Sequence, residues 1–166
     1  LDSVEVDDSM YPIVIERRGV IPGSQGFGEY EGAPAAGGVF YPLDHDMTIV
    51  YAADGTDFPP RGVLGGGDAT PSYSIKQTAN GDEIVLPAFS EEVIEEGSRI
   101  VFQASGGGGY GDPLKRDPVR VAATVNRGWL SREDAERVYK VVLKAAEEPG
   151  LLTVDQEKTE ALRGGN

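Results

Sequence analysis

The chain has 166 residues and a formal net charge of −13, from 28 Asp and Glu residues against 15 Lys and Arg residues. This acidic balance argues against nucleic-acid binding, which needs basic patches, and against binding to anionic membranes. Cysteine is absent, which excludes disulfides, thiolate metal sites and cysteine nucleophiles and fits a cytoplasmic protein. The length suits one domain, or one domain with a tail.

Residues 1–115 are predicted to form a β-rich body. Short stretches rich in β-branched and aromatic residues alternate with turns that contain Gly or Pro, and Asn80-Gly81 is predicted to form a tight turn. No helical segment separates these stretches, which argues against a doubly wound parallel sheet and predicts a barrel-like or sandwich arrangement. The expected strands are Tyr11–Arg18, Gly38–Tyr41, Met47–Ala53, Glu83–Leu86 and Arg99–Ala104.

Residues 116–166 are predicted to form a C-terminal tail of about three short α-helices with no strand among them. Asp117-Pro118 suits a helix start, because Asp caps free N–H groups and proline fits the first helical position. Ser131 to Asp134 resembles a capping box, and a further cap begins at Thr153. We therefore expect helices from Pro118 to Gly128, from Ser131 to Pro149, and from Thr153 to about Arg163.

A glycine-rich run is the most informative stretch of the chain, and it consists of Gly106, Gly107, Gly108, Gly109, Tyr110, Gly111, Asp112 and Pro113. Its glycines match the dinucleotide-binding pattern GxGxxG, but such a site needs a helix that begins at the turn. Here the first helix is expected only at Pro118, and no Gly-Lys-Ser/Thr follows as in a P-loop. The alternatives are a sharp exit from the sheet into the tail, or close packing against another backbone.

Two other segments are candidates for binding. The loop with Gly65–Gly67 could bind an anion through Arg61, although an ordered surface loop explains the same residues. His45 lies between Asp44 and Asp46, but alternation along a strand places the histidine on the opposite face from both aspartates. An exposed acidic turn is therefore favoured over a metal site, and no nucleophile–base pair is visible, so we assign no catalytic residue.

Several motifs resemble the C-terminal end of hydantoinase B proteins, from the family of ATP-dependent hydantoinases, acetone carboxylases and acetophenone carboxylases. The resemblance covers nearly the whole chain, but B-type subunits of this family are several times longer. The motifs are Tyr11-Pro12, Gly23–Gly28, Phe58–Gly62, Gly65-Gly66, Gly106–Leu114, Arg116–Pro118, Val125–Ser131, Val138–Val142 and Val154–Arg163.

The resemblance implies a small, non-catalytic subunit of an ATP-dependent complex, inactive alone, with ketone carboxylation of the acetophenone carboxylase type as the favoured reaction. A fragment of a hydantoinase subunit that opens cyclic amides is the alternative. The implied partners are a larger A-type subunit with an actin-like ATPase fold and a larger B-type subunit, and the partners would hold ATP and a divalent metal. The resemblance also implies that Gly106–Pro113 has a structural role or contacts the partner subunits. From the residues alone, a stand-alone domain that binds a small ligand at its glycine loops stays open.

Overall fold

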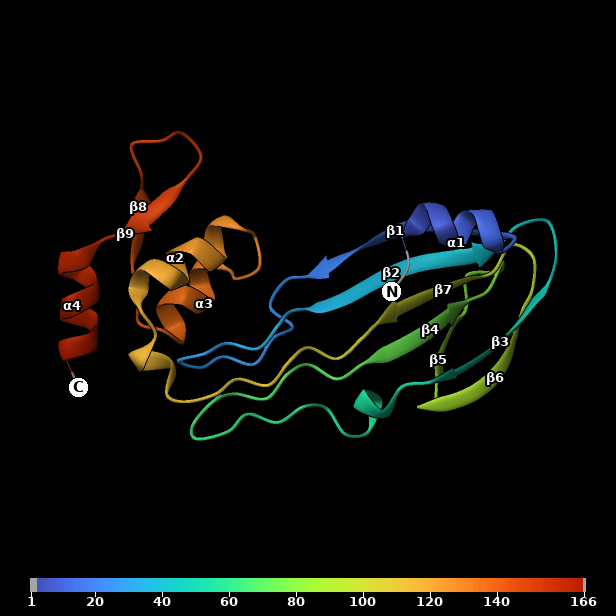
Figure 1. Ribbon diagram of the computed structural model, residues 1–166, viewed down its shortest axis with the longest axis horizontal. Coiled ribbons are helices and arrows are strands. Elements are labelled where there is room, and N and C mark those ends of the chain that lie inside the picture. Colours follow the sequence, from blue (N-terminus) through green and yellow to red (C-terminus); the bar gives the residue numbers. More distant parts are fainter. Residues whose placement is uncertain (1–2, 166) are drawn as a thin grey trace. The chain divides into compact units, whose positions relative to one another are not determined.

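A computed structural model describes residues 3–165 (Figure 1). The described chain divides into two compact units, each assembled from segments that are distant in sequence. Unit 1 contains the residues up to 20 together with residues 35–59 and 71–105, and unit 2 contains residues 21–34, 60–70 and those from 106 onward. The helical tail therefore shares a unit with two loops from the first 115 residues.

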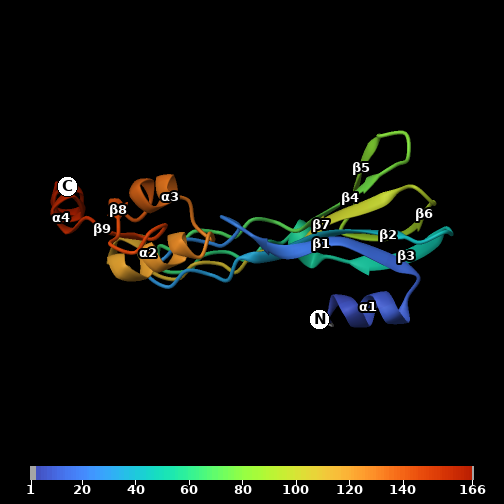
Figure 2. The same ribbon diagram turned by 90° about the horizontal axis from the view of Figure 1, so that it is seen from above.

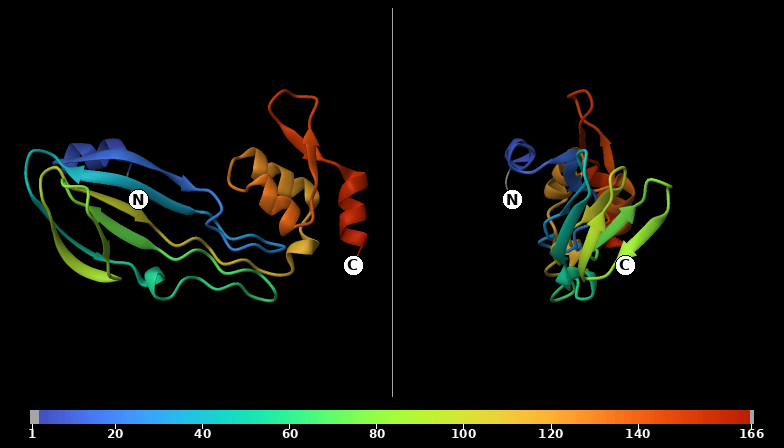
Figure 3. Two further views of the ribbon diagram at one scale, coloured as in Figure 1. Left: turned by 180° about the vertical axis from the view of Figure 1, so that it is seen from behind. Right: turned by 90° about the vertical axis from the view of Figure 1, so that its right-hand side faces the viewer.

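Unit 1 is built on a five-stranded sheet with the order β1-β2-β7-β4-β5 (Figure 3). The pairings of β2 with β7, β7 with β4 and β4 with β5 are antiparallel. A second antiparallel pair joins β3 to β6, and the short helix α1 (Val4–Met10) leads into β1 (Figure 2). The strands are β1 (Ile13–Ile21), β2 (Ala35–Pro42), β3 (Met47–Ala52), β4 (Tyr73–Gln77), β5 (Glu83–Leu86), β6 (Phe89–Ile94) and β7 (Arg99–Gln103).

The core of unit 1 lies between these two sheets. Leu86, Ile94 and Ile100 are buried, and partly buried side chains from β2, β3 and β7 pack against them. Two sheets that share one apolar core form a sandwich-like arrangement, because each sheet buries one face. The prediction of a mainly β protein is confirmed, and the strands of the described chain do not close into a barrel.

All five predicted strands exist, while β4 and β6 were not expected. The predicted turn at Asn80-Gly81 joins β4 to β5, and Gly81 has a φ of 89°, in the left-handed region that favours glycine. Single turns of 3-10 helix also occur at Asp54–Thr56 and Pro113–Lys115.

Unit 2 contains three helices and a small hairpin. The helices are α2 (Pro118–Asn126), α3 (Arg132–Arg137) and α4 (Gln156–Gly164), and the hairpin pairs β8 (Leu143–Ala145) with β9 (Leu152–Val154). Asp117 caps α2 and Ser131 caps α3, as the sequence predicted, whereas Asp155 caps α4. The core of the unit is centred on Tyr139, which is fully buried.

The helix expected from Ser131 to Pro149 is wrong beyond Arg137. The prediction of a tail without strands is also wrong, because β8 and β9 lie between α3 and α4. Lys140 has a φ of 53°, which ends the helical path, and the β-branched Val141 and Val142 that follow lead into β8. The backbone N–H of Val142 donates to Oγ1 of buried Thr159 at 3.0 Å, and β8 pairs with β9. Pairing with a distant segment therefore outweighs the local helical pattern.

Candidate functional site

The glycine run packs directly against backbone from two other segments of unit 2, residues 21–34 and 60–70. A Cβ atom added to any of Gly106 to Gly109 would lie closer than 3.0 Å to a backbone atom of another segment. Side chains at these positions would force the segments apart. The backbone neighbours are those of Ser24 for Gly106, Ala33 for Gly107, Arg61 for Gly108 and Phe27 for Gly109.

Most N–H groups of the run are already used in hydrogen bonds within unit 2. The distances from donor nitrogen to carbonyl oxygen are 2.8 Å from Gly107 to Ala33, 2.9 Å from Gly109 to Gly67, 2.9 Å from Tyr110 to Tyr30 and 2.9 Å from Gly111 to Val63. A phosphate cradle needs such N–H groups to point at the ligand. Close packing against another backbone, one of the alternatives for this run, is therefore present in the structure.

The end of the run leads into the helices. Oδ1 of Asp112 accepts a hydrogen bond from the Leu114 N–H at 2.9 Å, and Pro113 begins the 3-10 turn. The α-helix starts only at Pro118, as expected, so no helix N-terminus lies at the glycine turn. Gly26, Gly62 and Gly66 belong to motifs noted in the sequence, but their close approach to other backbone was not predicted, and Gly32 was not singled out.

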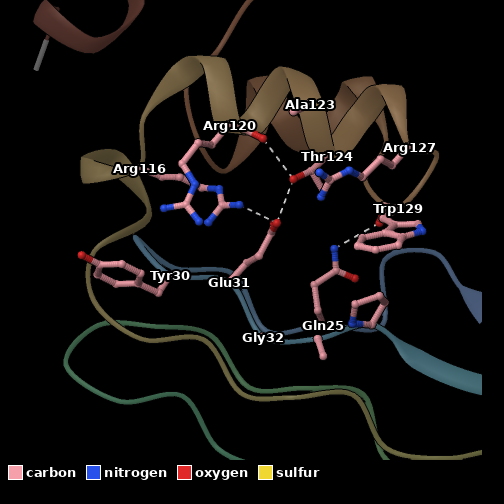
Figure 4. Close-up of a pocket in the computed structure, with 12 residues that line it drawn as sticks. Gln25, Tyr30, Glu31, Gly32, Arg116, Arg120, Ala123, Thr124, Arg127 and Trp129 are labelled. Carbon is pink, nitrogen blue, oxygen red and sulfur yellow. Dashed lines mark hydrogen bonds and ion pairs between the residues drawn. The ribbon is translucent and has the colours of Figure 1, made fainter.

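A cavity of about 520 Å³ lies between residues 25–34 and helix α2, all within unit 2 (Figure 4). Arg116, which is 5% exposed, forms an ion pair of 2.5 Å with Oε1 of Glu31. The same carboxylate oxygen accepts a hydrogen bond of 2.8 Å from the hydroxyl of Thr124. In Figure 4 the three side chains point toward one another at one end of the cavity. The pair is buried and hydrogen-bonded, which fixes its geometry.

Three polar atoms in the lining have no partner among the described residues, although they are buried. They are Oε1 of Gln25, Oε2 of Glu31 and Nε of Arg116. The Gln25 side chain is oriented by its other atom, since Nε2 donates to the Trp129 carbonyl at 3.1 Å. Buried polar groups nearly always have hydrogen-bond partners, so these three atoms need partners from outside the chain, either water or a ligand.

Two exposed arginines flank these buried groups. Within residues 3–165, neither Arg120 nor Arg127 forms an ion pair, and the Arg127 guanidinium lies 5.5 Å from the ring centroid of Trp129. Sequence reasoning did not find this cavity. Arg116 was visible as part of a family motif, but nothing in the sequence connects it to Glu31, 85 residues away.

Two further groups hold the helices around the cavity. Burial, and secondarily the charge of Glu31, raises the pKa of Tyr139 to about 12, so its phenol stays neutral near pH 7. Burial lowers the pKa of Arg163. The Arg163 guanidinium donates to the Tyr139 carbonyl and, at 3.0 Å, to the Arg116 carbonyl. Helix α4 is thereby attached to the start of α2.

The remaining candidates from the sequence are engaged locally. Arg61 is exposed, and Asp68 accepts a hydrogen bond of 2.8 Å from the Gly62 N–H, which closes the loop on itself. His45 Nδ1 lies 2.6 Å from the Leu43 carbonyl oxygen. Among residues 3–165, no group of three or more His, Cys, Asp or Glu side chains is placed to hold a metal ion. In the same residues no helix is long and apolar enough to span a membrane.

The family model for hydantoinase B/oxoprolinase matches residues 1–113. The chain belongs to this family. It is 31% identical over 144 residues to caprolactamase subunit beta of Pseudomonas jessenii, an alignment that covers 84% of this chain and 25% of that protein. It is 38% identical over 82 residues to the acetophenone carboxylase delta subunit of Aromatoleum aromaticum, which covers 49% of this chain and 11% of that protein. The resemblance found in the sequence is confirmed.

Two solved structures share the fold. A nucleotide-free acetone carboxylase superposes with a TM-score of 0.78 at 22% identity, over 99% of this chain and 26% of the other. The caprolactamase of Pseudomonas jessenii superposes with a TM-score of 0.75 at 24% identity, over 98% and 28%. The chain of this hydantoinase B family member thus spans about a quarter of the length of the relatives that it matches.

Proposed function

We propose that this chain is a non-catalytic module of the hydantoinase B type that works within an ATP-dependent carboxylase or amidohydrolase complex. The observation that carries the proposal is the superposition of 99% of this chain on 26% of an acetone carboxylase chain. The fold of this chain therefore corresponds to about a quarter of a larger enzyme chain, which supports a role as a module of such an enzyme. Several relatives are themselves named as subunits, which supports assembly with other chains.

The outer face of the β3–β6 pair is a suitable partner surface in unit 1. Val50 is 64% exposed and Phe89 is 71% exposed, and alternation along the two strands places both on the same face as Val93. The same face also carries Glu91, which lies opposite Val50. Exposed apolar residues gathered on one face mark protein contacts more often than scattered ones do. We assign this face to the contact with a larger subunit.

In unit 2 the glycine run would contribute to partner contacts mainly through one side chain. Tyr110 is 49% exposed, and its ring packs edge-on against Tyr30 with centroids 6.2 Å apart. Of the glycines on either side, Gly109 packs against the backbone of Phe27 and Gly111 donates its N–H to the Val63 carbonyl. Aromatic side chains are enriched at protein interfaces, so this pair is our second proposed contact.

Assembly is tested by native mass spectrometry of the complex from the source cells. We expect larger chains in stoichiometric amounts with this one, in the cytoplasmic fraction, and no ATP hydrolysis by the purified chain alone. The variant Val50→Lys should lose the larger chains, while Lys at this position can still pair with Glu91, which lies opposite on β6. Val20→Lys, at an exposed valine of β1, is the matched control. A clean monomer from the source cells would refute the proposal.

Two reactions remain within the proposal. Ketone carboxylation is supported by the match to the acetophenone carboxylase delta subunit and to the acetone carboxylase alpha subunit of Xanthobacter autotrophicus, 28% identical over 144 residues. Opening of a cyclic amide is supported by caprolactamase subunit beta, at 31% over the same length. ADP release by the purified complex distinguishes them: acetophenone with bicarbonate should stimulate it in the first case, and caprolactam in the second.

A further inference from the structure

The cavity beside α2 differs in charge from the rest of the chain. Its lining includes Arg116, Arg120 and Arg127 but a single carboxylate, that of Glu31, so it carries two net positive charges. The whole chain has a net charge of −13. A local excess of arginine in an acidic protein attracts an anion, because fields focus in a concave site.

The unpaired atoms add a second requirement. Nε of Arg116 is a buried donor that needs an acceptor, whereas Oε1 of Gln25 and Oε2 of Glu31 are buried acceptors that need donors. An anion with oxygen atoms alone satisfies the arginine and leaves both acceptors unpaired. A polyamine satisfies the acceptors, but the two exposed arginines, Arg120 and Arg127, repel it.

A ligand with both kinds of group satisfies all three atoms at once. Its carboxylate would meet the Arg116 Nε–H and the guanidinium groups of Arg120 and Arg127. Its N–H or O–H group would donate to Gln25 or Glu31. The Trp129 ring, with the Arg127 guanidinium 5.5 Å from its centroid, gives one wall an apolar surface for a short carbon chain.

We propose that this cavity binds a small carboxylate that also carries a hydroxyl or amino group, the chemical class of hydroxy acids and amino acids. The site lies wholly within unit 2 and stands independently of the proposed assembly with other subunits. Arg116, Gln25 and Glu31 would select the ligand, and Arg120 and Arg127 would attract it.

Isothermal titration calorimetry of the full chain tests the proposal with matched probes. L-malate and succinate are both dicarboxylates of four carbons, and only malate has a hydroxyl donor. We expect malate to bind, succinate to bind at least about tenfold more weakly, and putrescine not to bind. Equal affinity for malate and succinate, or no heat from malate and L-aspartate up to about 10 mM, would overturn the proposal.

Variants assign the binding to this cavity. Arg120→Gln and Arg127→Gln should each weaken malate binding about tenfold, since both side chains are exposed and their loss leaves the fold intact. Lys144→Gln removes the same charge at an exposed position of β8 outside the cavity, and its affinity should stay within about twofold of the parent. Equal losses in all three variants would reveal nonspecific charge attraction and reject the site.

The Arg116 Nε–H and Gln25 amide signals in NMR spectra should shift when malate is added, and unchanged signals would reject the site as well.

Discussion

The glycine packing in unit 2 makes a sharp prediction for Gly108→Ala. The new Cβ atom would lie 2.8 Å from the carbonyl carbon of Arg61 and closer still to its oxygen. Both are backbone atoms, so no side-chain rotation relieves the clash and the segment with residues 60–70 must move. That movement also strains the bond from the Val63 N–H to the Gly109 carbonyl, which is 2.9 Å long.

The size of the effect follows from these contacts. Overpacking costs about 1–3 kcal/mol, and weakening one backbone hydrogen bond costs about 1 kcal/mol more. We therefore expect Gly108→Ala to lower the free energy of unfolding by about 3 kcal/mol. For a chain of this length that corresponds to a drop of about 6–12 °C in melting temperature.

Thermal unfolding followed by circular dichroism measures this effect, with Gly19→Ala as the control. Gly19 lies in β1, is exposed, and has no atom within 4 Å of an added Cβ, so alanine there should be neutral or stabilise by about 0.5 kcal/mol. Hydrogen exchange should speed up at the Gly109 and Gly111 N–H groups in Gly108→Ala alone. A melting temperature within about 2 °C of the parent, with exchange unchanged, would refute the backbone-packing argument.

Two further substitutions test the helical part of unit 2. Thr159→Val removes the acceptor of the Val142 N–H and should lower the free energy of unfolding in denaturant by about 1–3 kcal/mol. The control Thr153→Val, at an exposed position of β9, should be nearly neutral. Equal effects of the two substitutions would contradict the role of the Thr159 hydroxyl. Tyr139→Phe should stay within about 1 kcal/mol of the parent in stability at pH 7, because the phenol oxygen has no hydrogen bond of good geometry in the described chain and its one neighbouring donor is the backbone N–H of Gly28. The folded-state pKa of Tyr139 is raised to about 12, so the tyrosine contributes stability that is complete below its unfolded pKa of about 10 and is lost as the pH rises toward 12. The free energy of unfolding of Tyr139→Phe should therefore rise relative to that of the parent between pH 10 and 12. A constant difference between the two proteins from pH 9 to 12 would contradict the raised pKa.

Local patterns predicted the parts of this fold that depend on neighbouring residues. Alternation and turn residues located β1, β2, β3, β5, β7 and the Asn80-Gly81 turn, and capping residues located the starts of α2 and α3 at Asp117 and Ser131. The same reasoning extended α3 too far, since the pattern of apolar residues after Ala135 suits a helix and a buried hairpin equally well. The distant Thr159 and the pairing with β9 decide between the two, and neither is a local signal.

The candidate sites depended on tertiary structure even more. The glycine run was visible in the sequence because glycine frees the backbone, and its family resemblance followed from the same residues. The space left by the missing side chains is filled by backbone atoms of two loops, residues 21–34 and 60–70, and only the tertiary structure shows this. Likewise, the amino-acid sequence determines that Arg116 and Glu31 carry opposite charges. Only folding brings them to 2.5 Å and leaves their remaining polar atoms beside a cavity, because contacts across 85 residues arise from packing and not from local propensity.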